Sequence, residues 1–205
     1  MITPPPPPPR VQFHRGRYYL DGQPVPRVTS ILAVVAKPGL TDWMLRVGQA
    51  EADRLREEGA ALGTAVHAAI EAVNTGRMPV VTGPAGVDLT AYADRYHAWK
   101  EATVREVVRA EYAVFHETHR YAGTLDMVAE LYDGRRALVD FKTNKSPDAT
   151  WGLQLAAYAA ALEAMGEPVD ARLVLHFPSG EGGRVLRVIE YPDHRHHDLA
   201  WRACV

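Results

Sequence analysis

Apolar and polar positions along the second half of the chain alternate in short blocks that are typical of β-strands. A helix over residues 88–109 precedes three such blocks, and an alanine-rich helix follows them before two further blocks. The predicted strands span residues 111–116, 123–131, 136–142, 171–177 and 184–191, and the alanine-rich helix spans residues 150–165. Asp133-Gly134 marks a hairpin turn between the second and third strands. This order of helix, three strands, helix and two strands predicts an α/β fold with a mixed central sheet.

The first part of the chain adds smaller elements to this core. A strand over residues 11–20 and a returning strand at residues 25–27 flank the turn signal Asp21-Gly22. Extra N-terminal helices are predicted next. The first spans residues 29–35, with Thr29 or Ser30 as its cap, and Lys37-Pro38-Gly39 separates it from the second. The second spans residues 41–58, with Thr41 as its cap and Gly59 as its stop. The third spans residues 62–74, and a Gly- and Pro-rich loop covers residues 75–87.

The chain has 205 residues, of which 47% are hydrophobic, and this suffices for one well-buried domain. Residues 4–9 are an unbroken proline run without backbone donors, so residues 1–10 are predicted to be a disordered leader. We therefore expect a single domain over residues 11–205, with its motif-bearing core at about residues 62–191.

The composition excludes several classes of site and protein. Cys204 is the only cysteine, which excludes an internal disulfide and an iron–sulfur cluster, and no Cys/His cluster has the spacing of a zinc site. No apolar run approaches the roughly 20 residues of a membrane helix, and the N-terminus lacks a signal-peptide pattern. We therefore expect a cytoplasmic protein without a membrane partner.

The net charge of −2 gives no sign of a nucleic-acid-binding protein, but its distribution is uneven. The first 56 residues carry eight basic side chains against four acidic ones. This part of the chain could face a phosphate backbone, or it could be an ordinary solvated surface. On charge alone the second interpretation is the better one.

The predicted strand at residues 136–142 ends in an acid, an apolar residue and a lysine. Strand alternation places Asp140 and Lys142 on one face and Phe141 on the other. A carboxylate can hold a divalent cation, and a lysine beside it can stabilise charge that develops on a phosphate. By itself the pattern could equally be an ion pair at a strand end.

Asp126 follows the residues Gly-Thr-Leu in the preceding strand, about as far before the Asp133-Gly134 turn as Asp140 lies after it. In an antiparallel pair the two carboxylates would therefore lie close together across the ladder. Carboxylates that are so close repel each other unless a cation or a proton joins them. A different register would leave both of them apart and exposed, but a bound Mg²⁺ or Mn²⁺ explains the pairing better.

Two helices carry polar pairs at a spacing of four residues, which places each pair on one helix face. His67 and Glu71 form the first pair, and Gln154 and Tyr158 form the second. A histidine added to two carboxylates suits Mn²⁺ at least as well as Mg²⁺. The second pair could orient the lysine or hydrogen-bond to a nucleic-acid phosphate, and both pairs could instead be ordinary polar residues of a helix surface.

The motifs G-T-x-x-H-x-x-I-E, G-T-L-D, D-F-K-T and Q-L-A-A-Y follow one another over about residues 62–177. In this order they resemble the PD-(D/E)XK nuclease superfamily, and within it the RecB-like exonuclease branch, including its phage-type and mitochondrial genome maintenance members. The resemblance implies a restriction-endonuclease-like core. Some relatives hold an iron–sulfur cluster through four cysteines, which this chain lacks, and no G-x-x-x-x-G-K-[ST] helicase loop is present.

The resemblance also implies roles for individual residues. The implied metal ligands are His67, Asp126, Asp140 and the carbonyl of Phe141; the implied catalytic residues are Asp126, Asp140 and Lys142; the implied supporting or DNA-contacting residues are Gln154, Tyr158, Glu71 and Glu111.

The implied activity is that of a DNA exonuclease that uses one or two Mg²⁺ or Mn²⁺ ions. Its substrate would be DNA with free ends, including single strands, in phage or bacterial recombination, repair or replication. The implied compartment is the cytoplasm of a bacterium or a phage-infected host, with a recombination or helicase protein as a possible partner. A structure-specific endonuclease, a non-catalytic DNA-binding subunit and a metal-binding protein unrelated to nucleic acid are the alternatives.

Two further groups of residues have more than one interpretation. Residues 193–198 are histidine-rich and could bind a metal adventitiously, although a surface segment is the simpler expectation. Four aromatic residues could stack on single-stranded bases or belong to the core: Trp43, Tyr92, Tyr96 and Trp99.

Overall fold

The computed structural model describes residues 10–35 and 38–205. The proline run and Lys37 of the predicted helix break lie outside these residues. In chain order the elements are β1 (Val11–His14), β2 (Arg17–Leu20), β3 (Gln23–Val25), α1 (Val28–Leu32), α2 (Pro38–Val47), α3 (Gln49–Asn74), the short 3-10 helix η1 (Pro84–Gly86), α4 (Thr90–Thr103), β4 (Val104–His116), β5 (Tyr121–Leu131), β6 (Arg136–Lys142), α5 (Thr150–Ala164), β7 (Ala171–His176), β8 (Arg187–Glu190) and α6 (His194–Arg202).

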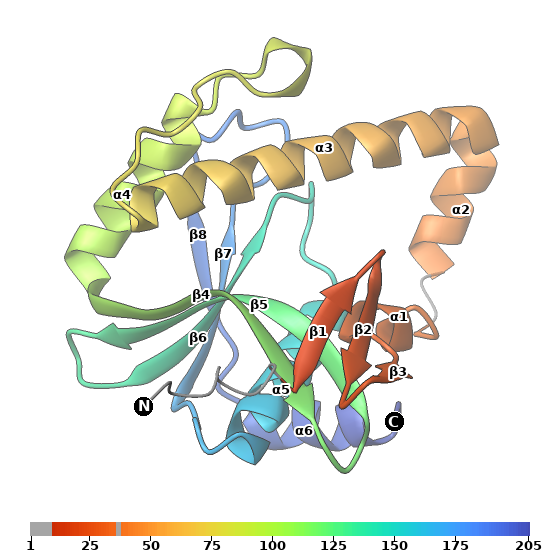
Figure 1. Cartoon of the computed structure of the whole chain (residues 1–205). Coiled ribbons are helices and arrows are strands. Elements are labelled where there is room, and N and C mark those ends of the chain that lie inside the picture. The colour runs from red at the N-terminus through yellow and green to blue at the C-terminus, as the bar shows by residue number, and fades with distance from the viewer. Residues whose placement is uncertain (1–9, 36–37) are drawn as a thin grey trace, which may run out of the picture.

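A five-stranded sheet in the order β4-β5-β6-β7-β8 forms the centre of the molecule. Only β6 and β7 are parallel, and α5 makes the crossover between them. Helices α3 and α4 cover one face of the sheet, whereas α5 and α6 cover the other (Figure 1). The predicted α/β fold with a mixed central sheet is confirmed.

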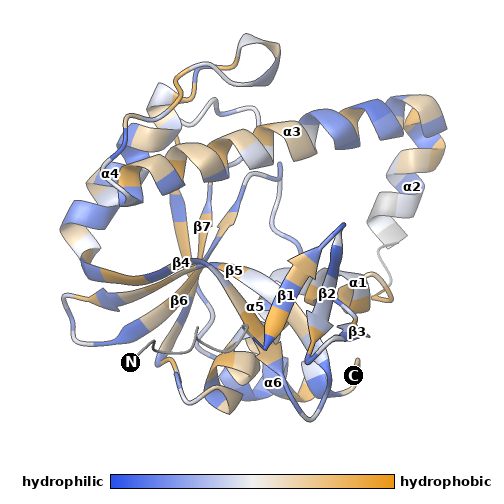
Figure 2. Ribbon diagram, in the orientation of Figure 1, coloured by the Kyte–Doolittle hydropathy of each residue, from blue (hydrophilic) through white to orange (hydrophobic). Residues whose placement is uncertain are grey.

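The core has one apolar layer on each side of this sheet. Leu138 and Val174 face Leu155 of α5 in one layer, and Val139 packs with Val66 of α3 in the other. The second half of α3 is therefore apolar, whereas its first half is largely hydrophilic (Figure 2). None of the described helices combines the length and the apolar character that crossing a membrane requires.

The first strands and the first helix differ from two predictions. The single strand expected over residues 11–20 is a hairpin, because Arg15 and Gly16 both have positive φ and turn the chain between β1 and β2. Helix α1 begins at Val28, so Thr29 and Ser30 lie inside it and no side chain caps its N-terminus. The apolar side chain of Val28 belongs to the core, which explains the earlier start.

The break between the next two helices was predicted at the wrong glycine. Gly48, with φ +83°, separates α2 from α3, whereas Gly59 lies inside the 26-residue helix α3. Arg54 pairs with Glu51 and Glu58 along the exposed helix side, and these pairs stabilise the helical turns just before Gly59.

The helix expected over residues 88–109 was also too long. Helix α4 ends at Thr103 and the chain passes directly into β4, where Val104 pairs with Leu131 of β5. Sheet pairing and the β-branched residues of this segment outweigh its helical spacing. The histidine-rich segment forms α6, which was not predicted; Asp193 accepts a hydrogen bond from the amide of His196 at 3.1 Å and caps it.

Candidate active site

A row of three acidic residues crosses the central sheet. The register of the neighbouring pairs places Glu111 of β4 level with Asp126 of β5, and Asp126 level with Asp140 of β6. The amide of Phe141 donates a 2.6 Å hydrogen bond to Oδ2 of Asp126, which fixes the side chain between the strands. The nearly equal numbers of residues from Asp126 and from Asp140 to the Asp133-Gly134 turn therefore predicted correctly that the two carboxylates lie close together.

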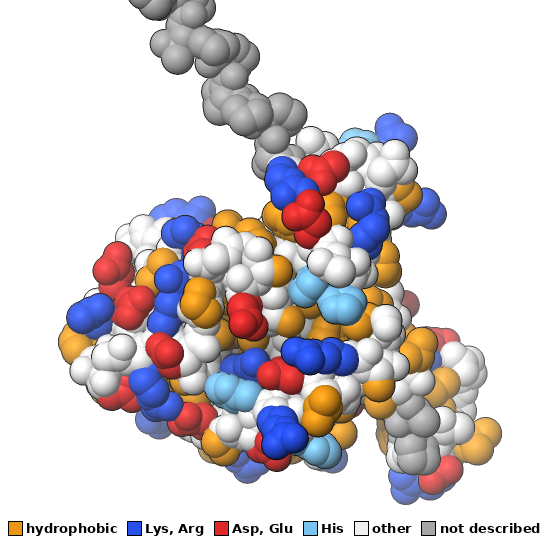
Figure 3. Space-filling model, turned by 90° about the horizontal axis from the view of Figure 1, so that it is seen from below, with side chains coloured by type: hydrophobic (Ala, Val, Ile, Leu, Met, Phe, Trp, Pro, Cys, Tyr) orange, Lys and Arg blue, Asp and Glu red, His pale blue; other side chains and the backbone are white. Residues whose placement is uncertain are grey.

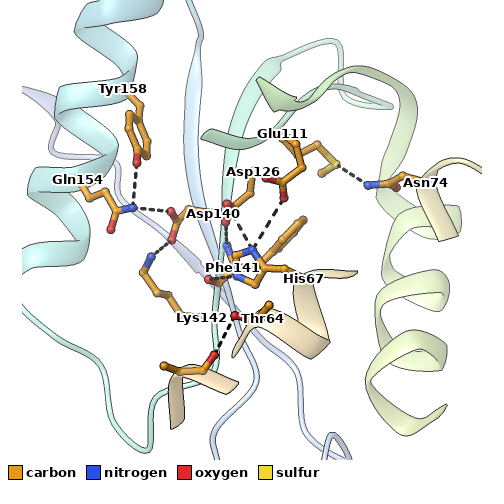
Figure 4. Close-up of polar contacts among 12 residues, drawn as sticks. Thr64, His67, Asn74, Glu111, Asp126, Asp140, Phe141, Lys142, Gln154 and Tyr158 are labelled. Atoms are coloured by element: carbon orange, nitrogen blue, oxygen red, sulfur yellow. Dashed lines mark hydrogen bonds and ion pairs between the residues drawn. The ribbon is translucent and has the colours of Figure 1, made fainter. Parts of the chain in front are cut away.

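His67 approaches this row from α3. Its Nδ1 atom lies 3.5 Å from Oδ1 of Asp126 and 4.0 Å from Oε1 of Glu111, as Figure 4 shows. One ligand atom from each of these three side chains lies within 4.8 Å of the others. We call His67, Glu111 and Asp126 the acceptor cluster.

The second ring nitrogen of His67 supports a cation-binding role for the cluster. Nε2 lies 3.2 Å from the carbonyl oxygen of Phe141, and in the tautomer that donates a hydrogen bond to this carbonyl the Nδ1 atom carries a lone pair. A histidine that donates one N–H to a backbone carbonyl and turns the other nitrogen to a metal is a common arrangement. Three acceptors then converge without a donor among them, and a divalent cation would satisfy all three.

The backbone at Glu111 is unusual. Its φ of +46° lies in the left-handed region, which residues other than glycine rarely adopt in a strand. Such conformations cost on the order of 1–3 kcal/mol and persist where surrounding structure enforces them, often at functional sites. Here the strained residue is the one that carries its carboxylate to His67.

Asp140 has different partners from the acceptor cluster. Its Oδ2 atom lies 2.5 Å from Nζ of Lys142, and Gln154 of α5 donates a 3.1 Å hydrogen bond to Oδ1. Gln154 also lies 3.4 Å from the hydroxyl of Tyr158, which is buried against Gly123. Asp140 and Lys142 therefore share a sheet face, as strand alternation predicted, and Phe141 points to the other face against Tyr96.

Electrostatics show that the row holds more negative charge than its surroundings can easily accommodate. Burial and the neighbouring charge of Asp140 raise the pKa of Asp126 to about 7. Burial also raises the pKa of Glu111. Burial opposes the charged form of Lys142, but Asp140 and Asp126 outweigh this effect, so the pKa of Lys142 is raised and the amine stays protonated.

Several residues singled out in the sequence have other partners. Glu71 does not join His67 but lies 2.8 Å from the guanidinium of Arg77. Tyr92 and Tyr96 are buried in the core, so they cannot stack on bases as they stand, and Trp99 packs against Tyr96. Trp43 is half-buried on α2.

A cleft that the sequence did not predict opens beside Lys142. It has a volume of about 670 Å³ and lies between α1, α2, the loop after β6 and the start of α5. Lys142 and Gln154 line it together with residues of α1, of the turn after α1 and of α2, among them Val34 in the turn and Met44 in α2. No sequence signal identifies these residues, because only the fold brings α1 and α2 to the end of β6.

Three of the eight basic residues of the N-terminal part form ion pairs. Arg10 contacts Asp21 and Glu117, Arg54 contacts two glutamates, and Arg56 contacts Asp53. On the face seen from below, acidic, basic and histidine side chains intermingle (Figure 3). The ion pairs of the N-terminal part and the mixture of charges on this face favour a solvated surface over a phosphate-binding one.

Comparisons with known proteins point to one family. The model of the PD-(D/E)XK nuclease superfamily matches residues 88–203, which is more than half of the chain and includes the acidic row. No curated protein matches the chain. A solved structure described as "Crystal structure of SSO0001" is similar at 12% identity and a TM-score of 0.41, over 86% of this chain and 80% of that chain. Similarity at this level carries no information on function.

Proposed function

Because this chain belongs to the PD-(D/E)XK nuclease superfamily, we propose that it is a divalent-metal-dependent deoxyribonuclease that degrades DNA from its ends. The observation that carries the proposal is the position of the acceptor cluster beside a protonated lysine. His67, Glu111 and Asp126 converge at one end of the row, and Asp140 with Lys142 occupies the other. This combination of acceptors and one buried cation suits phosphodiester hydrolysis.

The acceptor cluster would hold the metal. One imidazole nitrogen and carboxylate oxygens suit Mn²⁺ and Mg²⁺, and the imidazole favours Mn²⁺ of the two. A bound divalent ion would supply Lewis-acid charge and a more acidic water molecule for attack on phosphorus. Asp140 lies next in the row and could complete the ligand set if Lys142 moved from it towards the substrate.

Lys142 is the side chain that would place a positive charge beside the phosphate. Its amine is mostly buried and paired with Asp140, so its charge is little screened by solvent. Lys142 is one of the residues that line the cleft, so a phosphodiester that enters the cleft would meet this ammonium group. Charge that develops on the phosphoryl oxygens would be stabilised there without reorganisation of water.

Gln154 and Tyr158 position Asp140 in this proposal. The amide of Gln154 holds Oδ1 of Asp140, which leaves Oδ2 for Lys142. Tyr158 is buried, so a direct DNA contact is not part of its proposed role. Both side chains come from α5, a long buried helix that gives them a rigid base.

The choice of an exonuclease rests on the resemblance of the four motifs to the RecB-like branch, which is dominated by end-processing enzymes. Recombination, repair or replication of phage or bacterial DNA is the corresponding biological setting. A structure-specific endonuclease and a non-catalytic DNA-binding subunit on this fold are the alternatives.

The test is digestion of end-labelled linear DNA and of a covalently closed circle with Mg²⁺ or Mn²⁺. Blocking the 5′ and 3′ ends in turn identifies the end that is attacked. We expect linear DNA to shorten progressively and the circle to survive. Cleavage of the circle would indicate an endonuclease, and DNA binding without cleavage under either ion would indicate the non-catalytic subunit.

A further inference from the structure

We propose that an extended acidic segment of a partner protein binds in the groove between α4 and β8 and adds a strand to the free edge of the central sheet. We call this hollow of about 450 Å³ the β8 groove; Arg95 and Trp99 of α4 line one side of it, and Arg184, Leu186 and Val188 line the other. None of the described residues that line it belongs to the acidic row, so this site is distinct from the candidate active site.

Strand β8 leaves one edge of the sheet open. It is the last strand in the order β4-β5-β6-β7-β8, and β7 is the only described strand that pairs with it. The backbone N–H and C=O groups on the outer side of an edge strand can pair with a strand from another chain. Val188 within β8 is 48% exposed, so an added strand would also find an apolar side chain to pack on.

The basic side chains of the β8 groove determine the charge of the ligand. Arg95 and Arg184 are both exposed, and in the described part of the chain neither forms an ion pair with an acidic residue. A guanidinium group binds a carboxylate through two parallel hydrogen bonds. Two such groups without an acidic partner in one concave surface therefore favour a ligand that carries carboxylates.

The same groove is less suited to nucleic acid. Asp94 lines the adjoining hollow of about 390 Å³ together with Arg95 and Arg184, and its carboxylate would repel a continuous phosphate backbone. Such a backbone also requires a longer row of cations than these two arginines. An extended peptide, by contrast, can place single carboxylates against the arginines, apolar side chains against Trp99, and its own amides against β8.

A second copy of this chain is also a poor occupant. If two copies paired through their β8 edges, each would bring its own Arg95 and Arg184 towards the arginines of the other. Like charges that meet across an interface oppose association. A partner of opposite charge satisfies the groove better.

The loop that carries Arg184 is fixed on α4 by a close contact. Gly183 has φ +75°, and a Cβ atom at this position would lie 2.5 Å from Cδ2 of Tyr92. A glycine is therefore required for the loop to approach α4 so closely. Tyr92 is itself buried and packs on Phe177, with 5.7 Å between ring centres. The groove is thus formed before a ligand binds, which reduces the entropy lost on binding.

The test measures binding of fluorescein-labelled peptides to the full chain by fluorescence anisotropy in EDTA. The probe is a peptide of about eight residues, the length of a typical strand, that begins with two aspartates and continues with alternating valine and threonine. A second peptide has lysines in place of the aspartates. A third has N-methyl groups on its backbone amides, which removes the donors that strand pairing requires.

Two variants reverse the charge of the groove, Arg95→Glu and Arg184→Glu. Arg195→Glu is the matched control, because Arg195 is an exposed arginine on α6, which covers the other face of the sheet (Figure 1). Since all three side chains are exposed, the variants should fold normally.

We expect the acidic peptide to bind the wild type about tenfold more tightly than the lysine peptide, and each groove variant to lose about tenfold in affinity. Arg195→Glu should keep the wild-type affinity, and the N-methylated peptide should bind no better than the lysine peptide. Equal binding of the acidic and lysine peptides, or equal losses in all three variants, would overturn the inference. So would an acidic peptide that does not bind at millimolar concentration, an oligonucleotide whose binding Arg95→Glu abolishes, or a dimer that Val188→Lys dissociates.

Digestion of DNA separates this inference from the nuclease proposal. The two groove variants should digest DNA at the wild-type rate, because neither arginine belongs to the candidate active site. If the wild type cleaves DNA but does not distinguish the peptides, only the present inference fails. If it binds the acidic peptide through Arg95 but cleaves nothing with Mg²⁺ or Mn²⁺, only the nuclease proposal fails.

Discussion

The ammonium group of Lys142 lies 2.5 Å from the carboxylate of Asp140, and both side chains are largely buried at the end of β6. This pair divides the acidic row into two parts. Asp140 is neutralised by a lysine, whereas Asp126 and Glu111 face Nδ1 of His67. One end of the row therefore carries its own cation, and the other end offers three ligand atoms that could hold a cation from solution.

The first prediction concerns the lysine. Lys142→Met should lower kcat on DNA by about 100-fold or more, because the ammonium charge beside the phosphate is lost. Lys145→Met is the control, since Lys145 is an exposed lysine three residues further along, in the loop after β6. Rates of release of labelled nucleotides under saturating Mn²⁺ measure the effect. Equal losses in the two variants would mean that Lys142 acts only by adding to the overall positive charge of the protein.

The second prediction concerns metal binding by the acceptor cluster. Mn²⁺ should raise the melting temperature of the wild type, by an amount that corresponds to about 2.7 kcal/mol at 100 times its Kd. Asp126→Asn and Glu111→Gln should each weaken Mn²⁺ binding in isothermal titration calorimetry. Glu71→Gln should not, because Glu71 is engaged by Arg77 away from the cluster. A loss in Glu71→Gln as large as that in Glu111→Gln would contradict the assignment of the cluster.

The third prediction is a pH dependence of stability in the absence of metal. The pKa of Asp126 is raised from 3.8 to about 7, by burial and by Asp140, so the folded protein binds more protons than the unfolded chain between these values. The free energy of unfolding contributed by this group therefore falls as the pH rises through that range, and the contribution is fully restored below it.

Urea unfolding in EDTA at about pH 5 and pH 7 measures this slope, with Asp126→Asn as the reference because it cannot titrate. The wild type should lose more stability than the variant between the two pH values. Added Mn²⁺ should reduce the difference, since the cation replaces the proton between the carboxylates. Parallel pH profiles of wild type and variant without metal would show that Asp126 ionises normally in the folded protein.

The sequence predicted most of the site, and the reason is that its residues lie on regular elements. Strand alternation related Asp140 to Lys142, the length of the hairpin related Asp126 to Asp140, and helical spacing related Gln154 to Tyr158. No spacing rule joins Glu111 to His67, because nothing in a β-strand pattern shows that one residue adopts a positive φ and leans towards a helix.

The parts that the sequence did not predict depend on competition between local signals and long-range packing. Gly48 and Gly59 give the same stop signal, and only the conformation at Gly48 ends a helix. The start of β4 has helical spacing, but pairing of Val104 with Leu131 makes it a strand. The cleft wall joins segments about 100 residues apart, Val34 and Lys142 among them, so no local pattern can reveal it.

The fourth prediction uses the strained backbone of Glu111. Glu111→Gly removes the steric cost of φ +46° and one carboxylate of the crowded row, so we expect the metal-free protein to be as stable as the wild type or more stable, by about 1 kcal/mol. Its Mn²⁺ affinity should nevertheless fall. Thermal unfolding in EDTA and calorimetric titration measure the two quantities. Glu111→Ala is the matched variant, because it loses the carboxylate but keeps the strain. Equal stability of the Gly and Ala variants would show that the backbone conformation there stores no strain.

The fifth prediction concerns Gly123, the glycine of the G-T-L-D motif. A Cβ atom at this position would lie 2.7 Å from Cε1 of Tyr158, so Gly123→Ala must displace a buried ring. We expect a loss of about 1–3 kcal/mol in the free energy of unfolding, as is usual for overpacking. Activity should fall as well, because Gln154 lies between Tyr158 and Asp140 and would move with the ring.

The companion variant Tyr158→Phe separates these two effects, since it keeps the ring and removes only the hydroxyl that lies 3.4 Å from Gln154. The double variant Gly123→Ala/Tyr158→Leu, with a side chain that lacks the clashing ring, should recover part of the stability lost in Gly123→Ala. Urea unfolding and DNA digestion of all three variants, measured together, provide the test. If Gly123→Ala loses activity without losing stability, the ring is not displaced, and the glycine then acts in some way other than by leaving room for Tyr158.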